Sequence, residues 1–189
     1  RLDRPVAIKV MGRDYVTDPT FRARFEREAR ITAGLAHPNV VAVYDQGADG
    51  PIVYLIMELV DGGTLRDVLR AGPLPVPMVV SVLEPMLAAL GAAHAAGLVH
   101  RDVKPENVLI SAHGEVKVAD FGLVRALSNQ TLATGDVILG TVAYLSPEQV
   151  ERGVADKRSD VYSAGIVGFE MLTGTPPFTG DNPISVAYQ

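Results

Sequence analysis

Eight consecutive residues near the middle of the chain, His100 to Asn107 (HRDVKPEN), carry two cations, two acids, an amide and an imidazole. An apolar segment, residues 79–99, leads into this stretch, and an apolar strand is predicted directly after it at Val108–Ile110. A solvated turn is the ordinary reason for charge between two apolar elements. Here the following residues bring another carboxylate back to the same place, which favours chemistry over solvation.

That carboxylate is Asp120, and the sequence predicts that it meets Asn107 at one end of a β-hairpin. Asn107 opens the strand, residues 111–114 (Ser-Ala-His-Gly) turn the chain, and residues 115–119 return it to Asp120. Because the first residue of one hairpin strand lies beside the last residue of the other, the amide and the carboxylate converge. Two hard oxygen ligands suit Mg²⁺, which takes the rest of its shell from water and phosphate.

Asp102 precedes Asn107 by five residues in the loop that leads into this hairpin, so we expect it close to the metal. An acid at that position, with Lys104 beside it, can act as a base or orienting group for a hydroxyl nucleophile. We therefore interpret the charged stretch as a set of catalytic and metal-binding residues for phosphoryl transfer.

A second pair of charged residues lies near the amino terminus. In the predicted strand VAIKVM, alternation puts Lys9 on the face opposite Ile8, and a strand lysine is usually a solvated outer-face residue. The helix predicted over residues 18–35 changes this interpretation, because Glu28 falls on the same stripe as Phe21, Phe25, Thr32 and Leu35. An inward carboxylate needs a partner. Lys9 is the predicted partner, with a surface pairing to Arg24 or Arg27 as the alternative.

The elements that must position these residues change in kind near residue 60. Before it, short apolar runs at 5–11, 40–44 and 52–59 predict strands around the helix at 18–35. After Gly62-Gly63, helices are predicted at residues 64–71, 76–97 and 159–173. We expect an α+β fold with a small β-rich lobe (residues 1–60) and a larger helical lobe (61–189), joined near residues 58–63.

Composition limits the function classes. The 189 residues have a net charge of −5 and a pI near 5.3, so no basic face points to nucleic acid as a partner. The chain has no cysteine, which excludes disulfides and thiolate metal sites and fits a cytoplasmic location. It opens without a signal-peptide pattern. Residues 79–99 are long enough to cross a bilayer, but Glu84, Pro85 and His94 favour a buried helix of a soluble domain.

Four motifs then occur in a fixed order across nearly the whole chain. They are VAIK (6–9), HRDVKPEN (100–107), DFG (120–122) and GTVAYLSPE (140–148), the last followed by SDVYSAG (159–165). One such motif is weak, whereas four in order are specific. With them the sequence resembles the eukaryotic-type (Hanks-type) Ser/Thr protein kinases. The resemblance implies a protein-kinase-like two-lobe fold and ATP-dependent phosphotransfer to proteins.

The resemblance also assigns roles at the phosphate end of the site. Lys9 would hold the α- and β-phosphates of ATP and pair with Glu28 in the active arrangement. Asn107 and Asp120 would hold Mg²⁺ or Mn²⁺. At the adenine end, backbone groups of Glu58 and Val60 would bind the base. The remaining adenine positions would be a gatekeeper side chain and the two residues that sandwich the ring, namely Met57, Ala7 and Leu109.

For the acceptor, Asp102 would take or orient the proton of the substrate hydroxyl, and Lys104 would neutralise charge on the moving phosphoryl group. The Val-Lys-Pro-Glu between Asp102 and Asn107 differs from the alanine-arginine variant usual in tyrosine kinases. Lys104 and Thr141 resemble Ser/Thr enzymes, in which that Thr contacts the catalytic Asp. A protein Ser or Thr acceptor is the prediction.

Residues 127–136 form a polar stretch in the position of the family's activation loop. A phosphothreonine there would carry about −1.5 to −2 charge and could order the loop by pairing with Arg101. We predict autophosphorylation at Thr134 and Thr131, with Ser128 less favoured; the alternative is that these hydroxyls only fill the loop. A kinase homodimer for phosphorylation in trans, and a membrane anchor outside this chain, are further expectations.

The sequence departs from the family pattern in two places. No G-x-G-x-x-G is found in it, and the arginine that would pair with Glu148 is expected outside these residues. We therefore expect a fragment with little ATP turnover by itself, cut from an active parent. The rivals are a pseudokinase, which usually lacks Lys9, Asp102 or Asp120, and a P-loop or Rossmann protein, which needs a glycine motif after a strand. Lys9, Asp102 and Asp120 are all present, which disfavours a pseudokinase. The glycine motif is not found in the sequence, which disfavours a P-loop or Rossmann protein.

Overall fold

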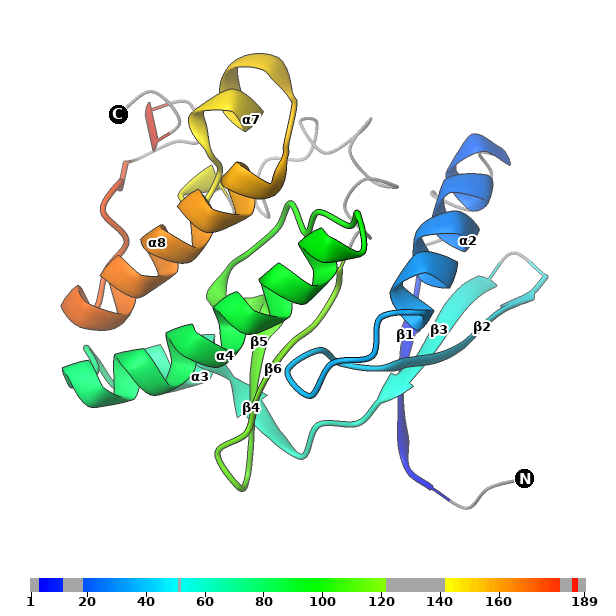
Figure 1. The fold of residues 1–189 in the computed structure, drawn as a ribbon, viewed down its shortest axis with the longest axis horizontal. Coiled ribbons are helices and arrows are strands. Elements are labelled where there is room, and N and C mark those ends of the chain that lie inside the picture. Colours follow the sequence, from blue (N-terminus) through cyan, green and yellow to red (C-terminus); the bar gives the residue numbers. More distant parts are fainter. Residues whose placement is uncertain (1–3, 12–18, 51, 122–141, 181–184, 187–189) are drawn as a thin grey trace.

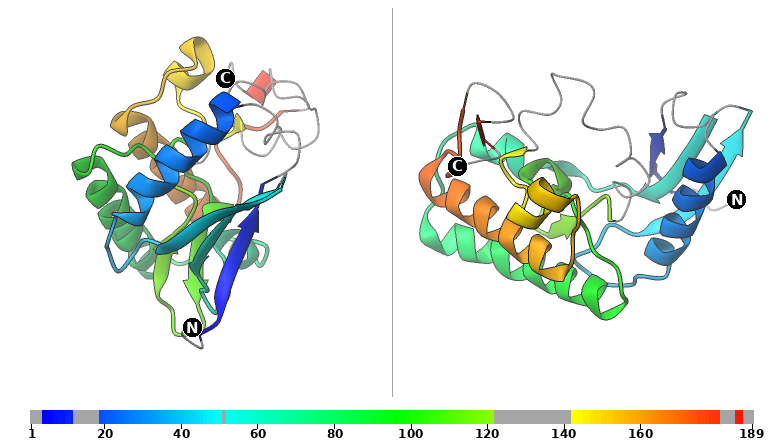
Figure 2. Two further views of the ribbon diagram at one scale, coloured as in Figure 1. Left: turned by 90° about the vertical axis from the view of Figure 1, so that its right-hand side faces the viewer. Right: turned by 90° about the horizontal axis from the view of Figure 1, so that it is seen from above.

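The computed structural model describes residues 4–11, 19–50, 52–121, 142–180 and 185–186. Within these ranges the elements form two lobes that lie side by side and are joined by residues 59–61 (Figures 1 and 2). The smaller lobe holds one sheet and one helix, and the larger lobe holds a second sheet and the other described helices. The predicted α+β class with two unequal lobes is confirmed.

The small lobe is built on an antiparallel sheet in the order β1-β3-β2. Its strands are β1 (Val6–Val10), β3 (Ile52–Glu58) and β2 (Val43–Asp49), and its helix is α2 (Pro19–Ala33). Phe25 and Ala29 of α2 pack with Val53 and Leu55 of β3 and with Met11 to form the core of this lobe. The alternation predicted for β1 is observed, because Ile8 and Val10 are 61% and 59% exposed.

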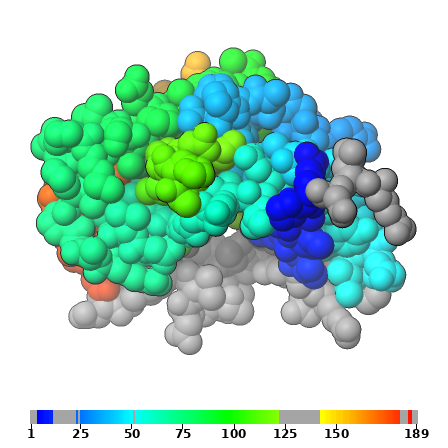
Figure 3. Space-filling model, turned by 90° about the horizontal axis from the view of Figure 1, so that it is seen from below, coloured from blue at the N-terminus to red at the C-terminus, as the bar shows by residue number. Residues whose placement is uncertain are grey.

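The larger lobe carries a second antiparallel sheet in the order β4-β5-β6. Its elements are β4 (Gly62–Thr64), α3 (Leu65–Leu69), α4 (Val76–Ala95), the 3₁₀ turn η1 (Pro105–Asn107), β5 (Val108–Ser111), β6 (Val116–Val118), α7 (Pro147–Arg152) and α8 (Lys157–Thr173). Seen from below, the turn between β5 and β6 lies between α3 and α4 on one side and the strands of the small lobe on the other (Figure 3).

Helix α4 supplies much of the core of this lobe. Its buried residues recur at helical spacing and face α8 and β6; they are Val79, Val82, Met86, Ala89, Leu90 and Ala93. The opposite face exposes Val76, Val80 and Leu87. Among the described residues α4 is the one helix long and apolar enough to cross a membrane. The structure packs one side of it against protein.

The helix boundaries follow local capping. Helix α8 begins two residues before the predicted start because the Asp156 side chain accepts a hydrogen bond from the Arg158 N–H and shares a capping box with Ser159. It ends at Thr173, and the capping Gly174 that follows has a φ of 84°, the left-handed conformation that glycine adopts at a helix end. Thr64 caps α3 in the same way, so the helix predicted from residue 64 starts at Leu65.

The strand predicted at residues 40–44 is confirmed only for its last two residues. Strand β2 begins at Val43, whereas the preceding residues lie against the other lobe: the Val41 N–H donates to the Val118 carbonyl at 2.9 Å, and the Val118 N–H donates to the Asn39 carbonyl at 2.8 Å. An apolar run predicts an extended segment but does not say which sheet it joins. The consequence is that the segment after α2 is attached to β6 of the larger lobe.

Candidate active site

The β5–β6 hairpin brings the predicted metal ligands to one end. Val108 is paired with Val118. The next hydrogen bond towards the open end of the hairpin, away from its turn, runs from the Ala119 N–H to the Asn107 carbonyl at 2.9 Å. Asp120 therefore follows the residue that pairs with Asn107, as the hairpin pattern predicted. Asp120 has a φ of 66°, which is uncommon for a residue with a side chain and marks a sharp turn of the backbone after β6.

The loop before the hairpin holds Asp102 from two sides. Lys104 Nζ lies 2.8 Å from Asp102 Oδ2, and Asn107 Nδ2 donates to the same oxygen at 2.9 Å and to the Asp102 carbonyl at 2.7 Å. The Asp102 side chain is 13% exposed and that of Lys104 18%. A carboxylate held by a cation and an amide at the edge of solvent has a fixed orientation.

A buried carboxylate that the sequence analysis did not single out supports this loop. Asp160, near the start of α8, is 1% exposed and accepts hydrogen bonds from the backbone N–H groups of His100 at 2.8 Å and Arg101 at 2.7 Å. His94 Nε2 of α4 lies 2.7 Å from it. The Arg101 backbone has a φ of 73°, a conformation that persists where surrounding bonds impose it. Asp160 supplies those bonds.

His100 is a structural residue of this loop. Its ring is fully buried, its Nε2 lies 2.9 Å from the Ala119 carbonyl, and its Nδ1 accepts the Asp102 N–H at 3.2 Å. A carbonyl can only accept, so Nε2 carries the proton and Nδ1 does not. The ring also contacts Phe121 edge-on, with 4.7 Å between ring centroids. These contacts pack and hydrogen-bond His100 beneath the loop that holds Asp102.

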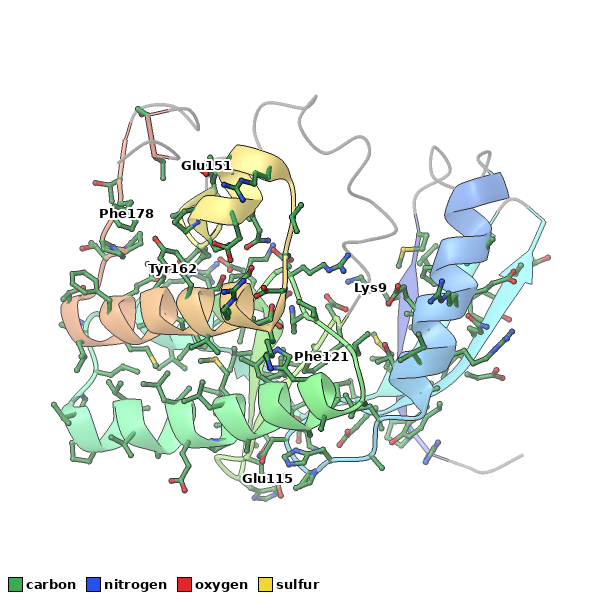
Figure 4. The ribbon with its side chains drawn as sticks, turned by 45° about the horizontal axis from the view of Figure 1, so that its top comes forward. Lys9, Glu115, Phe121, Glu151, Tyr162 and Phe178 are labelled. Atoms are coloured by element: carbon green, nitrogen blue, oxygen red, sulfur yellow. The ribbon has the colours of Figure 1, made fainter. Side chains whose placement is uncertain are left out.

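The charged residues of the small lobe are arranged differently from the expectation. Lys9 Nζ lies 2.5 Å from Asp120 Oδ2, so its ion pair crosses to the larger lobe and is not made with Glu28. Figure 4 labels Lys9 and Phe121, the residue that follows Asp120. Glu28 is buried on α2, as the stripe predicted. Thr32, one turn further on, donates to the Phe121 carbonyl at 3.3 Å and ties α2 to the same segment. The pattern of the small lobe alone could not reveal the carboxylate that Asp120 presents.

Comparison with known proteins agrees with this architecture. A family model described as "Protein kinase domain" matches residues 2–189. The chain belongs to the protein kinase family. It is 60% identical over 190 residues to "Serine/threonine-protein kinase PknL" of Mycobacterium tuberculosis (strain ATCC 25618 / H37Rv), which covers all of this chain and 48% of that protein.

A second relative is "Serine/threonine-protein kinase PknB" of Mycobacterium leprae (strain TN), 50% identical over 195 residues, all of this chain and 31% of that protein. The chain thus spans about half the length of one of these kinases and less of the other. The family predicted from the four motifs is confirmed.

The residues predicted at the adenine end come from the sheets of both lobes and from the linker between them. Ala7 of β1 is paired with Met57 of β3, and Met57 lines a cavity between α2, β3 and the Asp120–Phe121 segment. Leu109 is paired with Thr64 on one side and with Lys117 on the other. Glu58 ends β3, and Val60 lies in the linker. Glu58 and Val60 therefore lie where the lobes join, whereas Ala7 and Leu109 lie on the sheets of the small and the larger lobe.

A partly buried polar cluster next to the loop that holds Asp102 also escaped the sequence analysis. Arg66 of α3 lies 2.7 Å from Glu106 and 2.6 Å from Glu170, and it donates to the Tyr144 hydroxyl at 2.5 Å. The Tyr144 hydroxyl donates to Glu170 at 2.5 Å. Burial opposes the charge of Arg66, but its hydrogen bonds to Glu170 and Glu106 outweigh burial and raise its pKa above the usual value. Burial, with the Glu170 bond, raises the pKa of Tyr144.

Helix α7 is attached to the same loop. The Gln149 side chain donates to the Arg101 carbonyl at 3.0 Å, while its oxygen accepts from the Ser146 N–H at 3.1 Å. Glu148, for which an arginine outside the chain was expected, accepts a hydrogen bond from the Ser159 hydroxyl. That bond holds the pKa of Glu148 below its ordinary value. The SPE motif marked this segment in the sequence, but it did not reveal that Ser159 and Arg101 are the residues it contacts.

Four predicted positions, Ser128, Thr131, Thr134 and Thr141, lie outside the residues that the structure describes. Their predicted roles in phosphorylation and in contact with Asp102 stay predictions.

Proposed function

We propose that this chain is the catalytic domain of a serine/threonine protein kinase that transfers the γ-phosphoryl group of ATP to Ser and Thr hydroxyls of proteins. The observation that supports it best is the arrangement of Asp102, held by Lys104 and Asn107, at the hairpin end that also carries Asp120. An orienting carboxylate, a cation and two oxygen ligands in one place are what phosphoryl transfer needs.

Asp102 accepts or orients the proton of the acceptor hydroxyl in this proposal. Its carboxylate is already held by Lys104 and Asn107, so little reorganisation is required when the hydroxyl arrives. Lys104 is close enough to neutralise charge on the transferred group.

The residues at the hairpin end fit magnesium-bound ATP. Both side-chain bonds of Asn107 to Asp102 use Nδ2, which leaves Oδ1 as its oxygen ligand. Asp120 supplies a carboxylate, so the donors are hard oxygens of the kind Mg²⁺ (or Mn²⁺) prefers. The metal would neutralise the phosphate charge when bound. With ATP bound, Lys9 would leave Asp120 and hold the phosphates. It would then pair with Glu28, which lies on α2 of its own lobe.

The nucleotide base would lie between Ala7 and Leu109, with Met57 at the back. The N–H of Glu58 already donates to the Ala42 carbonyl at 2.8 Å, so the carbonyl is the group that Glu58 would offer to adenine. Val60 would supply the neighbouring backbone contact.

Regulation and setting are part of the same proposal. The similarity to two kinases with the printed name "Serine/threonine-protein kinase" supports a protein acceptor. We propose phosphorylation at Thr134 and Thr131 in trans within a homodimer, with Thr141 next to Asp102. A cytoplasmic kinase domain on a membrane-anchored parent fits the acidic, cysteine-free sequence.

The test is incorporation of ³²P from [γ-³²P]ATP by the full-length natural protein, with Asp102→Asn and Lys9→Met as variants. Each variant is expected to lower incorporation by about a hundredfold or more. A conservative exchange far from the site, Lys157→Arg, is the control. Wild-type labelling in both variants would contradict the assignment, and nucleotide binding without transfer by the wild type would favour the pseudokinase alternative.

A further inference from the structure

Glu58, the last residue of β3, is held from three sides before the chain enters the linker between the lobes. Its N–H donates to the Ala42 carbonyl at 2.8 Å, and its Oε2 accepts the Ala42 N–H at 3.2 Å. Its Oε1 lies 2.8 Å from Lys117 Nζ. The first two contacts stay within the small lobe, whereas the third crosses to the larger lobe.

Lys117 connects this carboxylate to the floor of the proposed nucleotide site. It lies on β6, directly opposite Leu109 of β5, so its backbone is one hydrogen-bonded strand away from the residue proposed beneath adenine. The Lys117 side chain is 15% exposed and that of Glu58 24%. A pair this sheltered is screened by salt less than a surface pair.

We infer that Glu58 and Lys117 form a positioning pair that sets the spacing between the linker and Leu109, and through it the affinity for the nucleotide. The inference rests on the proposed function, since it takes the Glu58 carbonyl and Leu109 as adenine contacts. Neither side chain needs to touch the nucleotide. The pair acts through the backbone that each residue carries.

The lobes have other connections, and these separate a positioning role from a purely structural one. The bonds between Val41, Asn39 and Val118 are made by backbone groups, and the Asn39 amide donates to the Val116 carbonyl at 2.9 Å. They remain when the Lys117 charge is removed. Loss of the pair should therefore loosen the linker without separating the lobes.

The test uses the full-length protein and the variants Lys117→Met, Lys117→Arg, Glu58→Gln and the double variant Glu58→Gln/Lys117→Met. Affinity is measured directly by titration with a fluorescent ATP analogue, and KM for ATP and kcat are measured separately. Lys117→Met should weaken binding and raise KM for ATP by about five- to tenfold, with kcat within about twofold. Lys117→Arg should keep the affinity and the KM for ATP near the wild-type values. The double variant should bind the nucleotide no more weakly than Lys117→Met.

The matched control is Arg158→Met, which breaks an ion pair with Asp156 between side chains that are 84% and 45% exposed. It should change neither binding nor KM. Thermal unfolding of each variant shows that it is folded. If Lys117→Met lowers the melting temperature but leaves nucleotide affinity and KM within twofold of the wild type, the pair is only structural and the inference is wrong. Independent effects that add in the double variant would overturn it too.

The binding titration also keeps this inference apart from the proposed function. If the wild type binds the nucleotide but transfers no phosphate, the kinase proposal fails while the affinity comparison still decides the role of Lys117.

Discussion

The two lobes hold their charged residues in different ways. In the larger lobe the loop that holds Asp102 rests on buried groups: Asp160 is 1% exposed, Glu170 2% and His100 fully buried. In the small lobe Lys9 is 37% exposed and its partner Asp120 belongs to the other lobe. Losing one of the buried contacts of the larger lobe costs much free energy, whereas an exposed ion pair such as Lys9–Asp120 can change partners at little cost. The loop is thus pre-arranged, and Lys9 is free to change partners.

The largest effect that can test this comparison is expected at Asp160. Asp160→Asn replaces one acceptor oxygen by a donor among three donors, His94, His100 and Arg101. We expect the free energy of unfolding to fall by about 3–5 kcal/mol. Urea denaturation measures it, with the exposed Asp156→Asn as the control. A loss below about 1 kcal/mol would show that the loop does not depend on this carboxylate.

A somewhat smaller loss is expected at Arg66. Arg66→Met keeps the length of the side chain but leaves Glu170, which is buried, without its cation. Because Tyr144 still donates to Glu170, part of the contact survives, and we expect a loss of about 2–3 kcal/mol by the same measurement. The exposed Arg70→Met, which breaks a pair with Asp67, serves as comparison. Equal losses in the two variants would contradict the argument from burial.

Tyr144 predicts a pH dependence of stability. Burial, followed by the Glu170 bond, raises its pKa above the usual value near 10. A raised pKa in the folded state means that the stabilisation is complete below pH 10 and is lost as pH rises beyond it, because only the unfolded chain ionises there. Stability measured from pH 8 to 11 should fall more steeply in the wild type than in Tyr144→Phe. Parallel slopes would place the tyrosine in contact with water.

The smallest effect on stability is expected in the small lobe. Lys9→Met removes a pair whose side chains are 37% and 21% exposed, so unfolding should change by less than about 1 kcal/mol, although phosphate transfer should be lost. Measuring both quantities on one preparation sharpens the contrast between the lobes. A stability loss as large as that of Asp160→Asn would remove the distinction.

Short-range sequence patterns were enough to predict several features of the fold. The strand alternation around Lys9, the helix stripe that contains Glu28 and the hairpin that unites Asn107 with Asp120 depend on neighbours within a few residues or on one turn. The four motifs supplied the family. Each of these needed only periodicity and order along the chain.

The missed features depend on contacts between distant segments. Asp160 lies sixty residues from His100, and Arg66 lies 104 residues from Glu170. Nothing local distinguishes such residues from solvated charges. The contact of Lys9 with Asp120 was missed for the same reason, since two carboxylates were available and only the folded chain selects between them. Val40 and Val41 joined the other lobe because an apolar run does not choose its sheet.

The edge-on contact of His100 with Phe121 makes the imidazole a built-in spectroscopic reporter. Ring currents from Phe121 shift the resonances of the imidazole protons, and the ¹⁵N shifts of Nδ1 and Nε2 report which nitrogen holds the hydrogen. A compound that dislodges Phe121 would change both signals at once. NMR would therefore distinguish ligands that rearrange this segment from ligands that only fill the proposed adenine site, without any assay of turnover.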